Sequence, residues 1–376
     1  MKVLVLNSGS SSVKYELWET SPEAIAANSD TLIKRGNVER VDDIDQALHT
    51  VFDDLGALSV DAVGHRIVHG GAKYTASVLV DAQVEKDIED LGELAPLHNP
   101  HNLAGVRAAQ RRLPSARHVA VFDTAFHHTL PQIAYAYGLP FEYLTERKIR
   151  RYGFHGISHR YVSWKFAELH GKSREQYRLI TCHLGNGCSV CAIEYGKSID
   201  TSMGFTPLEG LLMGTRAGDV DAGAILHLIT QDRQSPLEVL KMLNSESGLK
   251  GLSGVSNDMR DVQKHAAAGE PRSQLSVDMF CYRVRKYIGA YLAAMDGADA
   301  LIFTGGIGEN SPEIRAQICS KTASLGISLD AAANTAKSGE PRQIGHGRVP
   351  VWVVPTQEEL LIARDTLRCI LNIPHE

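Results

Sequence analysis

The stretch KVLVLNSGSSSVKYELWE, residues Lys2 to Glu19, places two apolar runs on either side of a small polar segment. Val3 to Leu6 is an unbroken apolar run, which is typical of a strand covered on both faces. Val13 to Leu17 alternates apolar and polar residues, which predicts a returning strand with one buried face. The stretch therefore predicts a β-hairpin in an α/β protein.

The segment between the two strands, Asn7 to Ser12, consists only of small or polar residues. Backbone N–H groups and hydroxyls in such a turn approach an anion without side-chain bulk in the way. Lys14, on the return strand, is expected to point back toward the turn. The turn is then either a phosphate cradle or a hairpin loop that is merely rich in Ser.

The composition is that of an ordinary globular protein. The chain has 376 residues, 43% of them hydrophobic and 22% charged, with a formal net charge of −5. This length favours two domains, and the absence of a long basic run argues against a nucleic-acid partner. Neither a signal-peptide core nor a membrane-spanning run is recognised, and six sparse Cys fit a reducing compartment, so we expect a cytoplasmic protein.

The opening pattern recurs at Leu179 to Gly196, as strand LITCHL, turn GNGCS and return strand VCAIEYG. Leu301 to Asn310, LIFTGGIGEN, is a third strand that runs into a glycine turn. Two copies of one hairpin, one opening each half, predict a duplicated domain around one nucleotide. The domain boundary is expected near Arg150, at the start of a loop to His159.

Periodicity and turn residues predict further elements between these hairpins. Strands are expected at Thr31–Gly36, Ala62–Gly71, Arg117–Asp123 and Pro350–Val354, and helices at Ile44–Leu55, Val84–Leu94, Asn99–Arg111, Arg160–Leu169, Ser311–Ala323 and Gln357–Leu371. Asp200 to Asp221 is expected to be a long loop that ends in the start of a helix.

The residues that stand out chemically suit phosphoryl transfer. Arg66 lies inside an apolar run and needs a partner, although a structural ion pair would serve equally well. Asp123 ends a strand, where α/β proteins place ligand chemistry. With Arg216 and His155, these residues offer positioning and charge neutralisation, and no Ser lies in a nucleophile elbow.

Three other kinds of site are not expected. Cys188 and Cys191 fall on a predicted strand, where residues three apart point to opposite faces. His155 and His159 are spaced i, i+4, but the Glu of a zinc-protease motif is missing after the first His. The GGIG turn at Gly305 lacks the spacing of a dinucleotide-binding loop.

The motifs resemble the acetate kinase family, within the actin, Hsp70 and sugar-kinase superfamily. The matching segments are LVLNSGSSSVKY, GHRIVHGG, VFDTAFH, RRYGFHGISH, HLGNG, DTSMGFTPLEGLLMGTR, SNDMRD, FTGGIGEN and PTQEELLIA, between residues 4 and 363. The resemblance implies duplicated actin-like ATPase (ribonuclease H-like) domains with an active-site cleft between them. The first domain would comprise residues 1–149 plus 358–376, with a returning C-terminal helix, and the second, nucleotide-binding domain residues 150–357.

The resemblance also implies the reaction: reversible, direct in-line transfer of the ATP γ-phosphate to acetate, giving acetyl phosphate and ADP. Mg²⁺, or Mn²⁺ in its place, would be required, and the protein would be a homodimer. A propionate or butyrate kinase is the nearest alternative. An ATPase of the chaperone kind on the same fold is an alternative of a different class.

Residue by residue, the resemblance assigns Asn7 and Glu358 to the magnesium site, and Arg66, Asp123, His155 and Arg216 to catalysis. It places Val68, Leu97, Phe154 and Pro207 around the acyl group, with Arg66 holding the carboxylate, and Val68 is expected to favour acetate over propionate. The implied nucleotide contacts are Ser10, Ser12, Lys14, His183, Leu184, Gly185, Asn186, Gly187, Asp258, Met259, Arg260, Gly306, Ile307, Gly308, Glu309 and Asn310.

Overall fold

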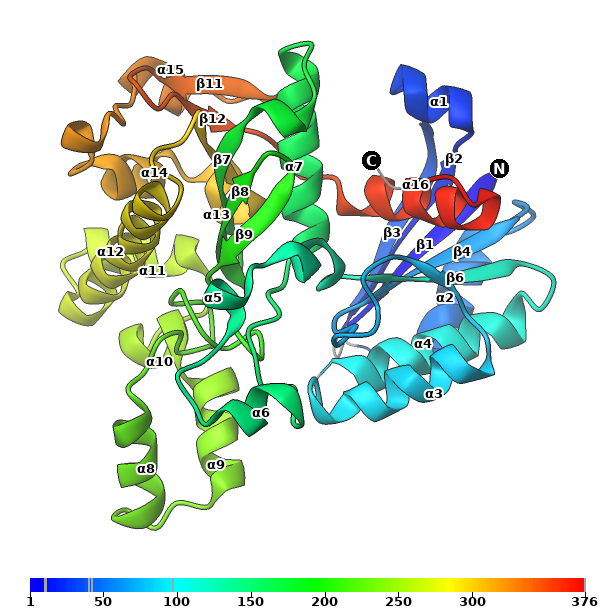
Figure 1. The fold of residues 1–376 in the computed structure, drawn as a ribbon, viewed down its shortest axis with the longest axis horizontal. Coiled ribbons are helices and arrows are strands. Elements are labelled where there is room, and N and C mark those ends of the chain that lie inside the picture. The colour runs from blue at the N-terminus through cyan, green and yellow to red at the C-terminus, as the bar shows by residue number, and fades with distance from the viewer. Residues whose placement is uncertain (10–11, 40, 42, 97, 375–376) are drawn as a thin grey trace. The chain divides into compact units, whose positions relative to one another are not determined.

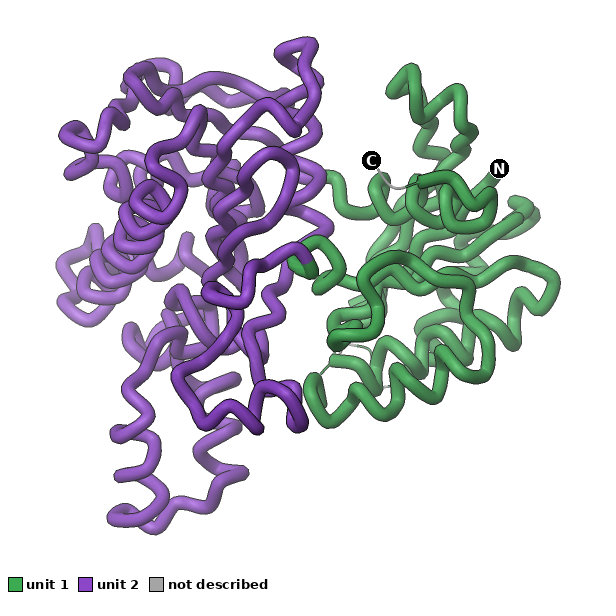
Figure 2. Tube along the Cα trace, in the orientation of Figure 1, with its two compact units in different colours: residues 1–128, 357–376 green, residues 129–356 purple. Residues whose placement is uncertain are grey.

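The computed structural model describes residues 1–9, 12–39, 41, 43–96 and 98–374 (Figure 1). The chain divides into two compact units, coloured in Figure 2. Unit 1 contains residues 1–128 and 357–376, and unit 2 contains residues 129–356. The division falls ahead of the boundary expected near Arg150. No helix in the described ranges is long and apolar enough to cross a membrane.

Unit 1 is a six-stranded mixed sheet in the order β3-β2-β1-β4-β6-β5. Its strands are β1 (Lys2–Ser8), β2 (Ser12–Glu19), β3 (Thr31–Glu39), β4 (Ala62–Ile67), β5 (Val78–Leu79) and β6 (Arg117–Phe122). Its α-helices are α1 (Pro22–Ala27), α2 (Ile44–Leu55), α3 (Ala82–Asp90), α4 (Asn99–Arg112) and α16 (Glu358–Leu371). The predicted opening hairpin is confirmed, with Asn7 opposite Lys14 in the register of β1 and β2.

Helices cover both faces of this sheet, which is why Val3 to Leu6 forms an unbroken apolar run that is almost completely buried. Helix α16 approaches β4 so closely that a Cβ at Gly64 would lie 2.3 Å from Thr366 Oγ1. On α4, a Cβ at Gly105 would lie 2.4 Å from Ser8 Oγ of β1. Figure 1 shows α16 lying across the strands of unit 1. Its first residue, Glu358, lies close to Arg66 of β4.

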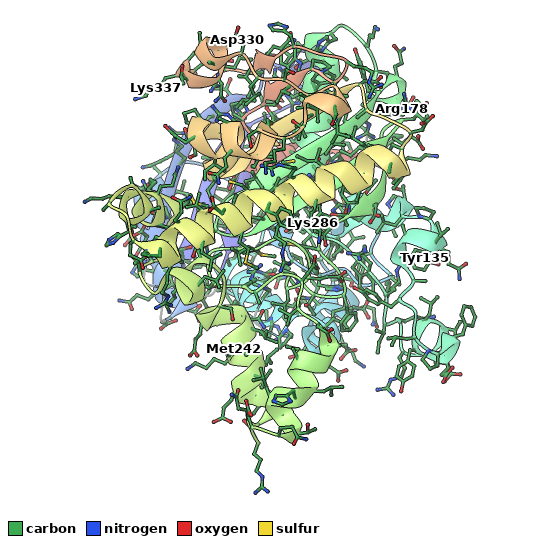
Figure 3. The ribbon with its side chains drawn as sticks, turned by 90° about the vertical axis from the view of Figure 1, so that its left-hand side faces the viewer. Tyr135, Arg178, Met242, Lys286, Asp330 and Lys337 are labelled. Atoms are coloured by element: carbon green, nitrogen blue, oxygen red, sulfur yellow. The ribbon has the colours of Figure 1, made fainter. Side chains whose placement is uncertain are left out.

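Unit 2 also contains a six-stranded mixed sheet, in the order β11-β12-β10-β7-β8-β9. Its strands are β7 (Arg178–Leu184), β8 (Cys188–Glu194), β9 (Lys197–Thr201), β10 (Ala300–Thr304), β11 (Arg342–Gly345) and β12 (Val351–Val353). Its α-helices are α5 (Gln132–Tyr135), α6 (Phe141–Thr145), α7 (Gly156–Leu169), α8 (Ala222–Thr230), α9 (Pro236–Lys241), α10 (Gly248–Ser253), α11 (Met259–Ala267), α12 (Pro271–Ala294), α13 (Gly305–Asn310), α14 (Pro312–Cys319) and α15 (Ala331–Thr335). Figure 3 shows the long α12, which carries Lys286.

The two sheets have the same topology. In each, three antiparallel strands (β3-β2-β1 and β9-β8-β7) continue into a parallel set (β1-β4-β6 and β7-β10-β12) that ends in an antiparallel edge strand. This identity of strand order confirms the duplicated domain that the repeated hairpins predict.

Two expected elements differ from the structure. The helix expected from Arg160 begins at Gly156, because His155 adopts a left-handed conformation (φ 55°) that turns the chain into the helix one turn earlier. The glycine turn expected after β10 is the short helix α13, whose first N–H, at Gly305, donates to Glu309 Oε1 (2.9 Å). The helix start expected at the end of the Asp200–Asp221 loop is confirmed by α8, whose N-cap is Asp221. Elements without a counterpart among the predicted ones are α1, β5, α5, α6, β9, α9 to α12, α15 and β11.

Candidate active site

In unit 1, Arg66 lies near the end of β4 and Asp123 directly follows β6, so adjacent parallel strands bring them together. The Arg66 guanidinium forms a bidentate pair with the Asp123 carboxylate: Nε donates to Oδ1 (3.2 Å) and Nη2 donates to Oδ2. Arg66 Nη1 also donates to Asn7 Oδ1 of β1 (3.2 Å). The partner expected for Arg66 is therefore Asp123, which is 1% exposed, whereas the Arg66 side chain is 19% exposed.

Glu358, the first residue of α16, completes what we call the Arg66 cluster: Asn7, Arg66, Asp123 and Glu358. Its Oε2 lies 3.9 Å from Arg66 Nε. Burial raises the pKa of Glu358 to about 7, with Asp123 adding to the effect and Arg66 opposing it. Burial alone would lower the pKa of Arg66, but the charges of Asp123 and Glu358 outweigh it and raise that pKa, so Arg66 stays a cation.

The Arg66 cluster fits a hard divalent cation. Asn7, Asp123 and Glu358 offer amide and carboxylate oxygens, the ligands that Mg²⁺ prefers. A cation would also favour the ionised form of Glu358, which burial disfavours. Among the described residues no group of three or more His, Cys, Asp or Glu is placed to hold a metal. In general Mg²⁺ keeps several waters or phosphate oxygens as ligands.

In unit 2, two donors converge on the turn between β7 and β8. A Cβ built on Gly187 would lie 3.2 Å from His155 Nε2 and 3.7 Å from Arg216 Nη1. Only a residue without a side chain leaves this space to an acceptor atom. Arg216 Nη1 also donates to the carbonyl of Pro207 (3.2 Å), which fixes the guanidinium to the loop after β9.

The predicted acyl-pocket residues are placed in both units. Val68 in unit 1 is 7% exposed, and its N–H donates to Asn102 Oδ1 (3.0 Å). In unit 2, Phe154 is 2% exposed and Pro207 is half-buried. Leu97 and Ser10, which were predicted as acyl and nucleotide contacts, lie outside the described residues.

A cavity of about 920 Å³ lies in unit 2 beside the β7–β8 turn. Half of the predicted nucleotide contacts line it: Gly185, Asn186, Asp258, Met259, Arg260, Gly306, Ile307 and Asn310. Asn257 Nδ2 donates to Asn186 Oδ1 (3.1 Å), which ties the turn to the start of α11. Asp258 caps α11 by accepting from Arg260 N–H (2.9 Å), and the Arg260 guanidinium lowers the pKa of Asp258.

Other predicted nucleotide contacts lie elsewhere. Ser12 and Lys14 belong to β2 of unit 1, and the residues of unit 2 that do not line the cavity are His183, Leu184, Gly187, Gly308 and Glu309. The Glu309 carboxylate accepts from the N–H groups of Gly305 (2.9 Å) and Thr356 (3.1 Å). It therefore holds the start of α13 in place.

The cavity also includes six residues that sequence reasoning missed: Asn257, Gln263, Lys264, Ala267, Ser311 and Glu313. Arg260, Gln263, Lys264 and Ala267 share one face of α11, at spacings of three and four. The sequence does contain a signal for this helix: Asp258 is a typical N-cap residue, and the residues that follow it have helical spacing.

The duplicated sheets, each with a hairpin turn at its centre, define an actin-like ATPase fold. The model of the acetokinase family matches residues 2–364, and the chain belongs to this family.

Individual proteins that match nearly the whole chain are acetate and propionate kinases. An acetate kinase of Thermotoga petrophila is 49% identical, with 99% of this chain and 100% of the relative covered. The crystal structure of Porphyromonas gingivalis acetate kinase is similar with a TM-score of 0.89 at 40% identity, covering 98% of this chain and 99% of that one. A propionate kinase from Francisella tularensis matches with a TM-score of 0.89 at 38% identity, covering 99% and 100%.

Proposed function

We propose that this protein catalyses reversible transfer of the γ-phosphoryl group of ATP to the carboxylate of acetate, with acetyl phosphate and ADP as products. The observation that carries the proposal is the Arg66 cluster, in which a half-buried guanidinium is held at the carboxyl ends of two parallel strands. A permanently charged, planar guanidinium suits a carboxylate better than lysine does.

The acceptor needs orientation and charge neutralisation more than a base. Acetate is ionised at neutral pH, so an oxygen of its carboxylate can form the new bond to phosphorus without first losing a proton. We assign Arg66 to the acetate carboxylate. Asp123 and Asn7 keep the Arg66 guanidinium in one orientation through their three hydrogen bonds.

We assign nucleotide binding to unit 2, with the adenosine in the cavity beside Asn186 and α11. The bond between the γ-phosphorus and the ADP oxygen breaks as the bond to acetate forms. His155 Nε2 and Arg216 Nη1, which converge over Gly187, donate to the oxygens of the transferring phosphoryl group. Donors fixed in advance stabilise the charge that is spread over those oxygens in the transition state.

Asn7, Asp123 and Glu358 are the residues that would hold Mg²⁺. When bound, the ion neutralises phosphate charge. In this role the Glu358 side chain is ionised. A homodimer and a cytoplasmic location, which the family resemblance implies, remain predictions.

Propionate is a second candidate acceptor, because a propionate kinase shares the fold along its whole length. Val68 is the residue on which we base the preference for acetate. A methylene in an apolar pocket changes the transition-state free energy by only about 1–3 kcal/mol, so propionate is expected to react more slowly and not to be excluded.

The proposal is tested by trapping the acyl phosphate with hydroxylamine, with ATP and each of acetate, propionate and butyrate as substrates. We expect the highest kcat/KM for acetate. A higher value for propionate would transfer the assignment to a propionate kinase. ATP hydrolysis that is indifferent to all three acids, without hydroxamate, would instead support an ATPase of another class.

A further inference from the structure

His155 and His159, spaced i, i+4 at the start of α7, contact the same hydroxyl group. Ser189 Oγ of β8 lies 2.9 Å from His155 Nδ1 and 2.7 Å from His159 Nε2. On its other side, His159 Nδ1 lies 2.7 Å from Thr181 Oγ1 of β7. We call these four residues the histidine chain. Ser189, His159 and Thr181 are all fully buried.

The protons along the histidine chain must all run in one direction. Ser189 has a single hydroxyl proton, so it can donate to only one of its two histidines. The described residues offer this buried proton no third acceptor, so Ser189 donates to one histidine and accepts from the other. If Ser189 donates to His155 Nδ1, then His159 donates from Nε2, and Thr181 donates to His159 Nδ1. If Ser189 donates to His159, every one of these bonds is reversed.

Thr181 decides between the two directions. Within the described part of the chain, the only hydrogen bond of its hydroxyl group is the one to His159. A buried hydroxyl proton without an acceptor is costly, so Thr181 donates and His159 Nδ1 accepts. The whole chain then points from Thr181 to His155, and neutral His155 carries its proton on Nε2.

We propose that Ser189, supported by His159 and Thr181, is a positioning residue that holds His155 in the tautomer with the proton on Nε2. This is the nitrogen that faces Gly187 and Arg216. The ring plane is fixed as well, because His155 has a left-handed backbone and stacks on His183 with ring centroids 4.3 Å apart. The catalytic meaning of the tautomer rests on the proposed function, in which Nε2–H donates to the phosphoryl group.

The tautomer is measured directly by ¹H–¹⁵N correlation of the histidine ring nitrogens in full-length protein, with the His155 signals assigned by their loss in His155→Gln. Wild type is expected to show the proton on Nε2. Ser189→Ala should shift His155 toward the Nδ1–H form and lower kcat about 10- to 100-fold, with the KM for acetate little changed. Thr181→Val should mix the two tautomers without altering any group next to His155.

Matched variants separate positioning from packing. His159→Gln keeps an N–H donor at the Nε2 position and should retain the wild-type tautomer and most of kcat, whereas His159→Asn loses that donor and should resemble Ser189→Ala. Thr201→Val removes an equally buried hydroxyl of β9, which donates to the carbonyl of Val190, and should change neither the tautomer nor kcat.

A wild-type His155 with its proton on Nδ1 would overturn the proposal, as would a Ser189→Ala protein with an unchanged tautomer and unchanged kcat. If the protein formed no acyl phosphate, yet showed the expected tautomer and its loss in Ser189→Ala, the proposed function would fail while the assignment of the histidine chain was upheld.

Discussion

The first hairpin of unit 1 and the first hairpin of unit 2 occupy the same place in sheets of the same strand order, yet their surroundings differ chemically. Beside β1, strand β4 carries Arg66 one residue before its end, and the charge of Arg66 is matched by Asp123 and Glu358. Beside β7, strand β10 ends with a neutral Thr304 and leads into Gly305 and α13.

The difference fits the two tasks that we propose for one scaffold. Unit 1 gathers charged groups at the ends of its parallel strands, which suits a small anion and a hard cation. Unit 2 uses glycines at the corresponding ends, so that backbone and cavity approach a larger ligand. The comparison predicts that activity is most sensitive to the removal of charged groups in unit 1, and to the filling of space beside glycines in unit 2.

Removing the charge from unit 1 should have the largest effect. Arg66→Ala leaves Asp123 and Glu358 without their cation, and we expect kcat to fall by about 10³-fold together with a raised KM for acetate. Arg66→Lys should restore little of this, because an ammonium group cannot form the fork. Initial-rate kinetics by the hydroxamate assay give both constants.

The control is Arg107→Ala, which breaks ion pairs with Glu85 and Glu89 on the surface of unit 1. Its kinetics should match those of wild type. Near-normal kcat and KM in Arg66→Ala would show that the ion pair with Asp123 is only structural.

The second-largest effect is expected when a side chain fills the space over Gly187 in unit 2. Gly187→Ala puts a methyl group 3.2 Å from His155 Nε2 and 3.3 Å from Cε1, where the ring must move. The ring must shift by a few tenths of an ångström, and a misplacement of about 1 Å can cost ~10²-fold in positioned catalysis, so we expect kcat to fall by about 10- to 10²-fold. Gly289→Ala is the matched control and should leave kcat unchanged, because beyond the adjacent backbone of α12 no atom lies within 4 Å of the new Cβ. Equal activity in both variants would remove Gly187 from the phosphoryl site.

The hairpins, and the helices and strands near them, could be predicted because strong apolar runs and period-two alternation mark them. The chemical types of the site also follow from local patterns, since a buried arginine demands a partner. The identity of that partner does not, because Asn7, Asp123 and Glu358 meet Arg66 only through strand order and the returning α16.

What sequence reasoning missed depends on tertiary contacts. Ser189 joins His155 to His159 across 34 and 30 residues of chain. The i, i+4 spacing of the two histidines was visible, but it suggested a metal site first, and the hydroxyl group between them is supplied by a different element. The face of α11 that lines the cavity was missed for a simpler reason, because the helix itself was not predicted.

A smaller effect should appear in acceptor choice. Val68→Ala removes two methyl groups from the proposed acyl pocket, and we expect the ratio of kcat/KM for propionate to that for acetate to rise about 10-fold. Val84→Ala on α3 changes the same side chain at nearly the same burial, 8% against 7% exposed, and should leave the ratio unchanged. If both variants leave it unchanged, Val68 does not line the acyl pocket.

The smallest effect tests whether the ionisable groups of β4 set the pH dependence of stability. His65 Nε2 lies 3.0 Å from His118 Nδ1 of β6, and His118 Nε2 lies 3.1 Å from the carbonyl of Leu113. Burial, together with the neighbouring His118, lowers the pKa of His65 well below its usual 6.5, and burial lowers the pKa of His118. Below pH 6.5 the unfolded chain therefore binds protons that the folded chain does not, and the free energy of unfolding falls as the pH falls.

His65→Gln keeps an N–H donor toward His118 Nδ1 but removes one titrating group. Between pH 6.5 and 5.5 its free energy of unfolding in urea should fall by about 1 kcal/mol less than that of wild type, while the two proteins differ little in slope above pH 7. The control His49→Gln replaces a histidine on α2 whose side chain is 56% exposed, and it should reproduce the wild-type slope. Parallel curves for wild type and His65→Gln would mean that the acid sensitivity lies outside β4.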